Sequence, residues 1–263
     1  DYQTLTVTQT NEVVVVSLNR PDKKNAMNFK MVNELIAVAK EIAQDKDVRA
    51  VILTGSNHTF CSGIDLGDLN NPKNQAYAVW ELVKPWQSDF QRVCLVWRDL
   101  PIPVIAVLEG HCLGAGLQLA LGTDIRISTP ECKLAIMEAK WGLVPDMGLT
   151  QAALGVIGAD VLKELAMSAR IIEGKQAKEL GLVTHLSDNP MAQALTLTQE
   201  FADRSPDAVL ASKRVINRMH QQSFSTLYQE KCWQLKLMLG HNRKIALKKV
   251  KDASARYGKR QFK

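Results

Sequence analysis

Two turns built around glycine, Ser62-Gly63-Ile64 and Gly114-Ala115-Gly116, each follow an apolar segment of the chain. Each turn is predicted to lead into a helix, and the first N–H groups of a helix have no partner within it. Such free backbone N–H groups can bind an anion or polarise a carbonyl oxygen. A purely structural role stays open at both turns, because small residues also let a helix pack closely on a strand.

Two carboxylates lie where they could move protons. Glu138 follows an apolar strand-like segment, and Asp146 lies eight residues later in the glycine- and proline-containing loop 142–148. Acids in apolar surroundings acquire raised pKa values and can exchange protons near neutral pH. We expect both to face one pocket, although Asp146 could instead cap the helix that follows it. Asp124 is interpreted as a structural acid that pairs with Arg126.

Several other kinds of site are disfavoured. The sequence has Leu119 where a dinucleotide-binding fingerprint requires its third glycine, and it contains no P-loop and no GxSxG motif. Cys61 and Ser62 have no evident base nearby in the sequence to activate them as nucleophiles. The five histidines show no metal-ligand spacing, so we expect no metal site. An odd cysteine count without a CxxC pair favours a cytoplasmic location, and no apolar run approaches the roughly 18 residues of a membrane span.

The net charge of +6 arises in the C-terminal tail. Residues 243–263 contain nine Lys or Arg and one acid, whereas the other 242 residues carry 24 basic and 26 acidic groups. The tail could be a solvated amphipathic helix with Ala246, Leu247 and Val250 facing inward, or it could bind phosphate groups. A nucleic-acid partner is not expected, because the tail has few aromatic residues and no known binding motif.

Strands and helices alternate through about two thirds of the chain, and helices dominate after residue 150. The predicted strands cover residues 4–8, 13–18, 50–54, 104–108, 124–128, 133–136 and 182–186. The predicted helices before residue 150 cover 28–44, 77–100 with a kink near Pro85, and 117–121. This order indicates an α/β core with parallel strand pairing, followed by a helical C-terminal part.

Together these segments resemble the crotonase family, the enoyl-CoA hydratases and isomerases. The resemblance spans nearly the whole chain. It is carried by Leu18-Asn19-Arg20-Pro21, Asn25-Ala26-Met27-Asn28, Val51-Ile52-Leu53-Thr54-Gly55, Phe60-Cys61-Ser62-Gly63-Ile64-Asp65-Leu66, Pro103-Val104-Ile105-Ala106, Gly110-His111-Cys112-Leu113-Gly114-Ala115-Gly116-Leu117-Gln118-Leu119, Thr123-Asp124-Ile125-Arg126-Ile127, Trp141-Gly142-Leu143-Val144-Pro145-Asp146-Met147-Gly148 and Ala177-Lys178-Glu179-Leu180-Gly181-Leu182-Val183.

The resemblance implies an α/β fold, a crotonase-like spiral of ββα turns with a C-terminal helical trimerisation region. The spiral core would cover residues 1–200. Residues 201–263 would form the helical region, serving in oligomerisation and as a lid over coenzyme A. The expected assembly is a homotrimer or a dimer of trimers. The predicted helix 77–100 would shape the acyl pocket, where Trp80, Trp86 and Trp97 either line the pocket or pack in the core.

For the site, the resemblance implies an acyl-CoA thioester as substrate and no permanently bound cofactor. The backbone N–H groups of Ile64 and Ala115 would form an oxyanion hole for the thioester enolate. The residues that would bind substrate or coenzyme A are Arg20, Lys24, Ala26, Ser62, Gly63, Asp65, Leu66, Gly114, Lys259 and Arg260.

The sequence departs from the family hydratases at their two glutamates. Gln118 stands in place of the first, and an amide exchanges no proton, although it can orient water. Glu138 matches the second, and Asp146 follows proline as an acid does in several family isomerases. We therefore expect a double-bond shift in an enoyl-CoA, with Asp146 as base and Glu138 as second candidate. The alternatives are 2-enoyl-CoA hydration, with Glu138 principal and Gln118 holding water, and an inactive acyl-CoA-binding homologue.

Overall fold

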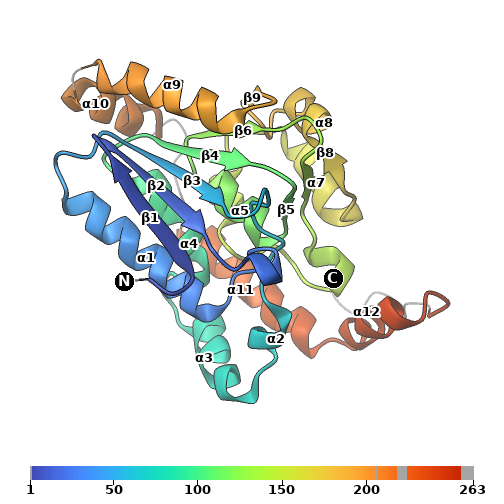
Figure 1. Ribbon diagram of the computed structural model, residues 1–263. Helices are drawn as coiled ribbons and strands as arrows, with labels where there is room; N and C mark the ends of the chain where they lie inside the picture. Colours follow the sequence, from blue (N-terminus) through green and yellow to red (C-terminus); the bar gives the residue numbers. More distant parts are fainter. Residues whose placement is uncertain (1, 205, 218–223, 256–263) are drawn as a thin grey trace.

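A computed structural model describes residues 2–204, 206–217 and 224–255. Its larger sheet has six strands in the order β1-β2-β3-β4-β6-β9 (Figure 1). The pair β1–β2 is antiparallel, and the other neighbouring pairs are parallel. The bounds are β1 (Leu5–Thr10), β2 (Val13–Leu18), β3 (Ala50–Gly55), β4 (Val104–Leu108), β6 (Ile125–Ser128) and β9 (His185–Leu186).

A second sheet of three short strands runs beside the first, in the order β5-β7-β8. It consists of β5 (His111–Leu113), β7 (Lys133–Ala135) and β8 (Ile172–Glu173). The chain passes from β4 in the large sheet to β5 in the small one, and then into a helix. It repeats the step from β6 to β7. These repeated turns form the spiral that the sequence resemblance implies.

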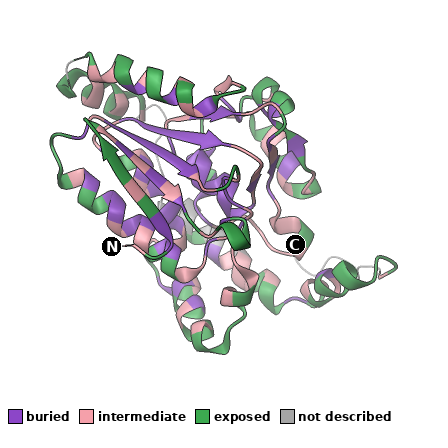
Figure 2. Ribbon diagram, viewed as in Figure 1, coloured by how far each residue is buried: buried purple, intermediate pink, exposed green. Residues whose placement is uncertain are grey.

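The central strands are buried because helices cover both faces of the large sheet (Figure 2). One face packs on the main core, which includes Leu35 of α1 (Phe29–Gln44) and Trp97 of α4 (Asp89–Asp99). The other face carries Ile52, Ile105 and Ile127, which pack against α9 (Pro190–Ala202). Parallel strands that are covered on both faces are expected to be almost wholly apolar, as β3 and β4 are.

The remaining helices are mostly short in the middle of the chain and longer near its end. They are α2 (Leu66–Leu69), α3 (Pro72–Val83), α5 (Ala115–Leu121), α6 (Leu149–Ala152), α7 (Ala159–Ser168), α8 (Gly174–Glu179), α10 (Pro206–Asn217), α11 (Phe224–Leu239) and α12 (His241–Lys251). Two 3₁₀ helices cover Pro21–Lys23 and Glu138–Trp141.

The division into a core over 1–200 and a helical region over 201–263 stays a prediction.

The prediction of one long helix over residues 77–100 is wrong: α3 and α4 are separate helices with an extended connection. Lys84, which precedes a proline, ends α3 with φ −58° and ψ 137°, because the proline ring disfavours a helical conformation before it. Ser88 then starts α4, where its side chain accepts a hydrogen bond from the Gln91 N–H in a capping box. Trp80 and Trp86 beside the break are half exposed.

The tail helix also differs from expectation. In α12, Ala246 is buried, whereas Leu247 and Val250 are about half exposed. Ala246 and Arg243 lie close to Gly142, where a side chain would meet them. The helix therefore docks through a small-residue contact, and its larger apolar side chains face outward in the single chain. Lys259 and Arg260 lie outside the described residues.

Candidate active site

The two glycine turns lie side by side because a parallel bridge joins Cys61 to Cys112. The Cys61 N–H donates to the His111 carbonyl at 2.8 Å, and the Leu113 N–H donates to the Cys61 carbonyl at 2.9 Å. Gly114 has φ 52° and ψ −120°, a conformation that effectively only glycine adopts. A side chain at Gly116 would lie 2.7 Å from Cys61 Cβ. The small residues are thus required for packing as well as for the turn.

Each turn also presents the backbone N–H that the resemblance singled out. At the first turn, the Met27 N–H donates to Gly63 and the Asp65 N–H donates to Met27, so the Ile64 N–H takes no part in this bridge. Ala115 is the first residue of α5, where an N–H has no acceptor within the helix. Both N–H groups belong to residues that line the same cavity. Their geometry is compatible with an oxyanion hole.

That cavity, of about 190 Å³, also takes in both candidate acids, Glu138 and Asp146. Its wall is formed by the two turns, the 3₁₀ helix Glu138–Trp141, the loop 142–148 and side chains from α2, α3, α4 and α11. The chain segments that carry the acids are thus brought to the space in front of the two N–H groups. Ser62, Gly63, Leu66 and Gly114 line it as well.

Glu138 is held by an amide that connects it to the Asp146 loop. The Gln118 Nε2 donates to Glu138 Oε1 at 2.7 Å, and the Gln118 Oε1 accepts from the Met147 N–H at 3.0 Å. Glu138 Oε2 is buried and has no hydrogen-bond partner within the described residues. Burial raises the pKa of Glu138, against the opposing effect of the Gln118 hydrogen bond. The carboxyl group is therefore placed to exchange a proton with a molecule in the cavity.

The Asp146 loop is positioned by α11, a helix far along the chain. The Gln234 Oε1 accepts a hydrogen bond from the Val144 N–H at 3.3 Å. On the same helix, the buried Lys231 ammonium donates to the carbonyls of Lys84 and Trp86. Asp146 lies near enough to Lys231 to oppose the lowering of its pKa by burial. These α11 residues were missed at the sequence level, because no local motif marks them.

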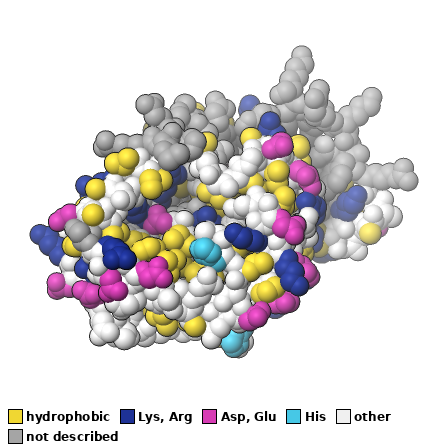
Figure 3. Space-filling model, turned by 90° about the horizontal axis from the view of Figure 1, so that it is seen from above, with side chains coloured by type: hydrophobic (Ala, Val, Ile, Leu, Met, Phe, Trp, Pro, Cys, Tyr) yellow, Lys and Arg dark blue, Asp and Glu magenta, His cyan; other side chains and the backbone are white. Residues whose placement is uncertain are grey.

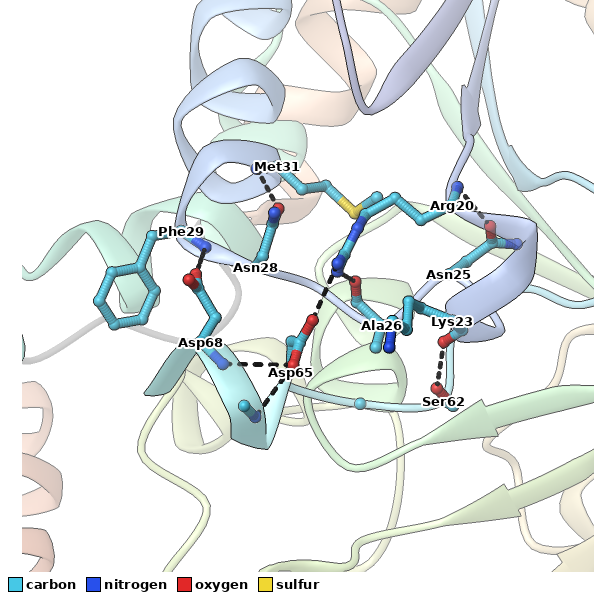
Figure 4. Close-up of polar contacts among 12 residues, drawn as sticks. Arg20, Lys23, Asn25, Ala26, Asn28, Phe29, Met31, Ser62, Asp65 and Asp68 are labelled. Carbon is cyan, nitrogen blue, oxygen red and sulfur yellow. Dashed lines mark hydrogen bonds and ion pairs between the residues drawn. The ribbon is translucent and has the colours of Figure 1, made fainter. Parts of the chain in front are cut away.

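Arg20 and Ala26, two of the residues predicted to bind coenzyme A, lie beside the first turn (Figure 4). Arg20 forms an ion pair with Asp65 at 2.9 Å and donates to the Ala26 carbonyl at 2.6 Å. Asp65 also caps α2 by accepting from two backbone N–H groups. The side chains of Arg20 and Asp65 thus hold the turn in place. Lys24 is exposed, has φ 48°, and lies near enough to His111 to contribute to the lowering of the His111 pKa.

Other chemistries find little support among the described residues. Burial raises the pKa of the Cys61 thiol to about 12, so it does not provide a thiolate nucleophile. Within residues 2–204, 206–217 and 224–255 no three His, Cys, Asp or Glu side chains gather as metal ligands. None of the helices described there has the length and apolar character of a membrane span.

Asp124 pairs with Lys213 of α10 at 2.7 Å instead of with Arg126 as predicted.

Comparisons with known proteins agree with the fold. The family model for enoyl-CoA hydratase/isomerase matches residues 8–255. Human mitochondrial methylglutaconyl-CoA hydratase is 34% identical over 213 residues, which are 78% of this chain and 61% of that protein. Mouse mitochondrial Delta(3,5)-Delta(2,4)-dienoyl-CoA isomerase is 35% identical over 236 residues, which are 86% of this chain and 71% of that protein.

A solved structure gives the same result for the fold. The crystal structure of enoyl-CoA hydratase from Bacillus anthracis is 28% identical and matches with a TM-score of 0.76, covering 96% of this chain and 98% of that one. The fold and site therefore define a crotonase-like protein. The chain belongs to the enoyl-CoA hydratase/isomerase family. It spans less than two thirds of the human hydratase that it matches.

Proposed function

We propose that this protein shifts a double bond in an enoyl-CoA. The thioester carbonyl binds the N–H groups of Ile64 and Ala115, which stabilise the negative charge that develops on its oxygen as an enolate forms. Asp146 removes the allylic proton and returns it at the other carbon, and Glu138 assists as a second proton carrier. No permanently bound cofactor or metal takes part. The substrate is the coenzyme A thioester itself.

The observation that supports this proposal is the arrangement of two acids around a single cavity, with the buried amide of Gln118 bound to one of them. Glu138 and Asp146 line it together with both glycine turns, and Gln118 occupies the α5 position beside Glu138. An isomerase needs one group that carries a proton between two carbons, and either acid meets that need. An amide at position 118 leaves one proton carrier fewer for adding water.

The second candidate function is the addition of water to a 2-enoyl-CoA. It is favoured by the unpartnered, buried Oε2 of Glu138 and by the raised pKa of this group. Gln118 uses one of its two amide hydrogens on Glu138 and could direct the other to a water molecule. In this case Glu138 is the principal acid–base group.

The decisive experiment incubates the protein with panels of 2-enoyl-CoA and 3-enoyl-CoA thioesters. Products are separated by chromatography, and their masses are measured by mass spectrometry. Water addition changes the mass, whereas double-bond migration changes only the retention time. Interconversion of 2-enoyl and 3-enoyl isomers supports the isomerase, and a hydrated product as the main outcome replaces it with the hydratase. Binding without turnover of any panel member indicates the inactive acyl-CoA-binding homologue.

We also propose a homotrimer or a dimer of trimers, and a cytoplasmic location. Figure 3 views the side that carries α9 and α10, where hydrophobic side chains gather between charged ones. Leu195, Val215 and Ile216 are between 46% and 68% exposed in the single chain. Exposed apolar groups of this kind mark surfaces that bind other protein surfaces. Light scattering coupled to size-exclusion chromatography tests the assembly, and a monomer at micromolar concentration contradicts it.

A further inference from the structure

The part of the cavity wall that α2, α3, α4 and α11 supply is apolar apart from one amide. It includes Leu69, Leu82, Phe90 and Met238, and the amide is Gln234. The proposed function assigns the thioester end of a substrate to the N–H groups of Ile64 and Ala115, which belong to the two turns in the rest of the cavity wall. The acyl chain of a bound thioester therefore extends along the apolar wall.

The charges in the cavity are all of one sign. Among the described lining residues, the charged side chains are Glu138 and Asp146, and both are acids. A carboxylate at the end of an acyl chain would enter an apolar space without a cationic partner. It would also meet the like charge of an ionised acid. Burying a charged group without a partner is strongly unfavourable.

Two buried lysines, Lys231 of α11 and Lys84 at the end of α3, are already engaged elsewhere. Lys231 directs its ammonium to the carbonyls of Lys84 and Trp86, outside the cavity lining. Lys84 directs its own ammonium to Glu81 at 2.8 Å, and both side chains are buried. Neither lysine can turn toward an acyl group without leaving these partners unsatisfied in a buried environment.

We propose that the site selects acyl-CoA thioesters whose acyl chain is an uncharged hydrocarbon and rejects chains that end in a carboxylate. This inference rests on the proposed function for the position of the thioester. It assigns specificity to the sign of charge along the wall from α2 to α11. The rest of the coenzyme A molecule is common to both kinds of substrate and does not contribute to the choice.

The test compares two ligands that differ only at the far end of the acyl chain. Hexanoyl-CoA and adipoyl-CoA have the same chain length, and adipoyl-CoA adds a terminal carboxylate. Isothermal titration calorimetry on the full chain is expected to give a Kd for hexanoyl-CoA that is at least about tenfold lower. Kinetics with 3-hexenoyl-CoA and 3-hexenedioyl-CoA, the matching substrates, are expected to show the same preference in kcat/KM.

The outcomes separate this inference from the proposed function. Turnover with equal or tighter binding of adipoyl-CoA overturns the charge selection and leaves the function standing. Tighter binding of hexanoyl-CoA, without turnover of the enoyl-CoA substrates, supports the charge selection and contradicts the proposed isomerase function. Failure of both thioesters to bind overturns both.

A matched pair of variants tests the physical cause. Met238 lines the cavity from α11 and is 44% exposed, so the fold should accept a polar side chain there. Met238→Lys adds a cation to the wall, and Met238→Gln adds polarity without charge. The lysine variant is expected to shift the ratio of the two Kd values at least about tenfold toward adipoyl-CoA, and the glutamine variant is expected to leave it near the wild-type value. An equal ratio in both variants contradicts a selection based on charge.

Discussion

The segments that carry the two acids in the cavity share a contact with Gln118 but differ in their other supports. Glu138 begins a 3₁₀ helix soon after β7, and its carboxylate is tied to Gln118 of α5, within the core of the spiral. Asp146 lies on a loop whose Val144 N–H is bound by Gln234, 90 residues further along the chain. Glu138 is thus held within the sheet framework, whereas the Asp146 loop is held both by Gln118 of that framework, through the Met147 N–H, and by a C-terminal helix. The site is complete only when both parts are in place.

The largest expected effect separates the chemical roles of the two acids. Asp146→Asn should lower the isomerase kcat by about 10²–10⁴-fold, because a general acid–base group contributes that much. Binding of a saturated acyl-CoA should stay near the wild-type value. Steady-state kinetics and calorimetry measure both. A loss of kcat below about tenfold contradicts the role of Asp146 as the base. If Glu138→Gln is inactive while Asp146→Asn remains active, the two roles are reversed.

The next effect concerns the N–H donor at the start of α5. Ala115→Pro removes this N–H at the first helical position, where proline is tolerated. We expect kcat to fall by about 10²–10³-fold, as for the loss of one oxyanion donor. Ala115→Gly keeps the N–H and serves as the control. If both variants lose activity equally while circular dichroism shows an intact fold, the donor role is wrong.

Gln118→Glu changes the contact that links the two acid-bearing segments. The new carboxyl would face Glu138 across the present 2.7 Å contact, and two such groups share a proton near neutral pH. We expect hydration of 2-enoyl-CoA to rise by about tenfold or more, because a second proton carrier is added. Gln118→Met, which removes the amide without adding an acid, should not raise hydration. A wild type that already hydrates efficiently, with no gain in the variant, contradicts the preference for an isomerase.

Lys231→Met tests the attachment of α11. The ammonium donates to two backbone carbonyls, and a hydrogen bond to a charged group contributes about 1.5–3 kcal/mol. Since 1 kcal/mol corresponds to roughly 2–4 °C in domains of about 150–250 residues, Tm should fall by about 3–12 °C. Calorimetric melting measures the change. Lys248→Met, at an exposed position of the neighbouring helix α12, is the control, and an equal shift in both variants contradicts a specific anchor.

The smallest expected effect is the pH dependence of stability at Glu138. Its pKa is raised above 4.5 by burial, so the folded chain retains a proton that the unfolded chain has released. Stability from this group therefore falls as pH rises from about 4.5 through the folded pKa. Glu138→Gln removes the fall, and its Tm relative to the wild type should be higher at pH 7 than at pH 4. The same difference at both pH values contradicts the raised pKa.

Local patterns predicted the parts of the structure that are determined locally. The β-branched run 13–18 forms β2, the helical spacing over 28–44 forms α1, and the apolar run 50–54 forms most of β3. The order of strands and helices, together with the motifs around the glycine turns, indicated the family. Both candidate acids were identified from their positions after a strand and in a loop.

The errors all involve contacts between distant segments or a break in a continuous pattern. The apolar spacing of 77–100 continues through Pro85, although the backbone turns there. Asp124 pairs with Lys213, which is distant in the sequence, instead of with its near neighbour Arg126. Leu247 and Val250 follow an inward-facing pattern, but both are about half exposed, and it is Ala246 that is buried. Periodicity gives a face of a helix and does not say what that face contacts.

The amino-acid sequence alone indicates the alternation of strands and helices, the two glycine turns, and the presence of two acids and an amide near them. These features follow from backbone preferences and side-chain types over a few residues. The hydrogen bond from Gln118 to Glu138, and the way α11 brings Gln234 and Met238 to the cavity, could be seen only in the folded chain. The physical reason is that hydrogen bonds and burial depend on distance in space, which the chain sets only when distant segments pack together.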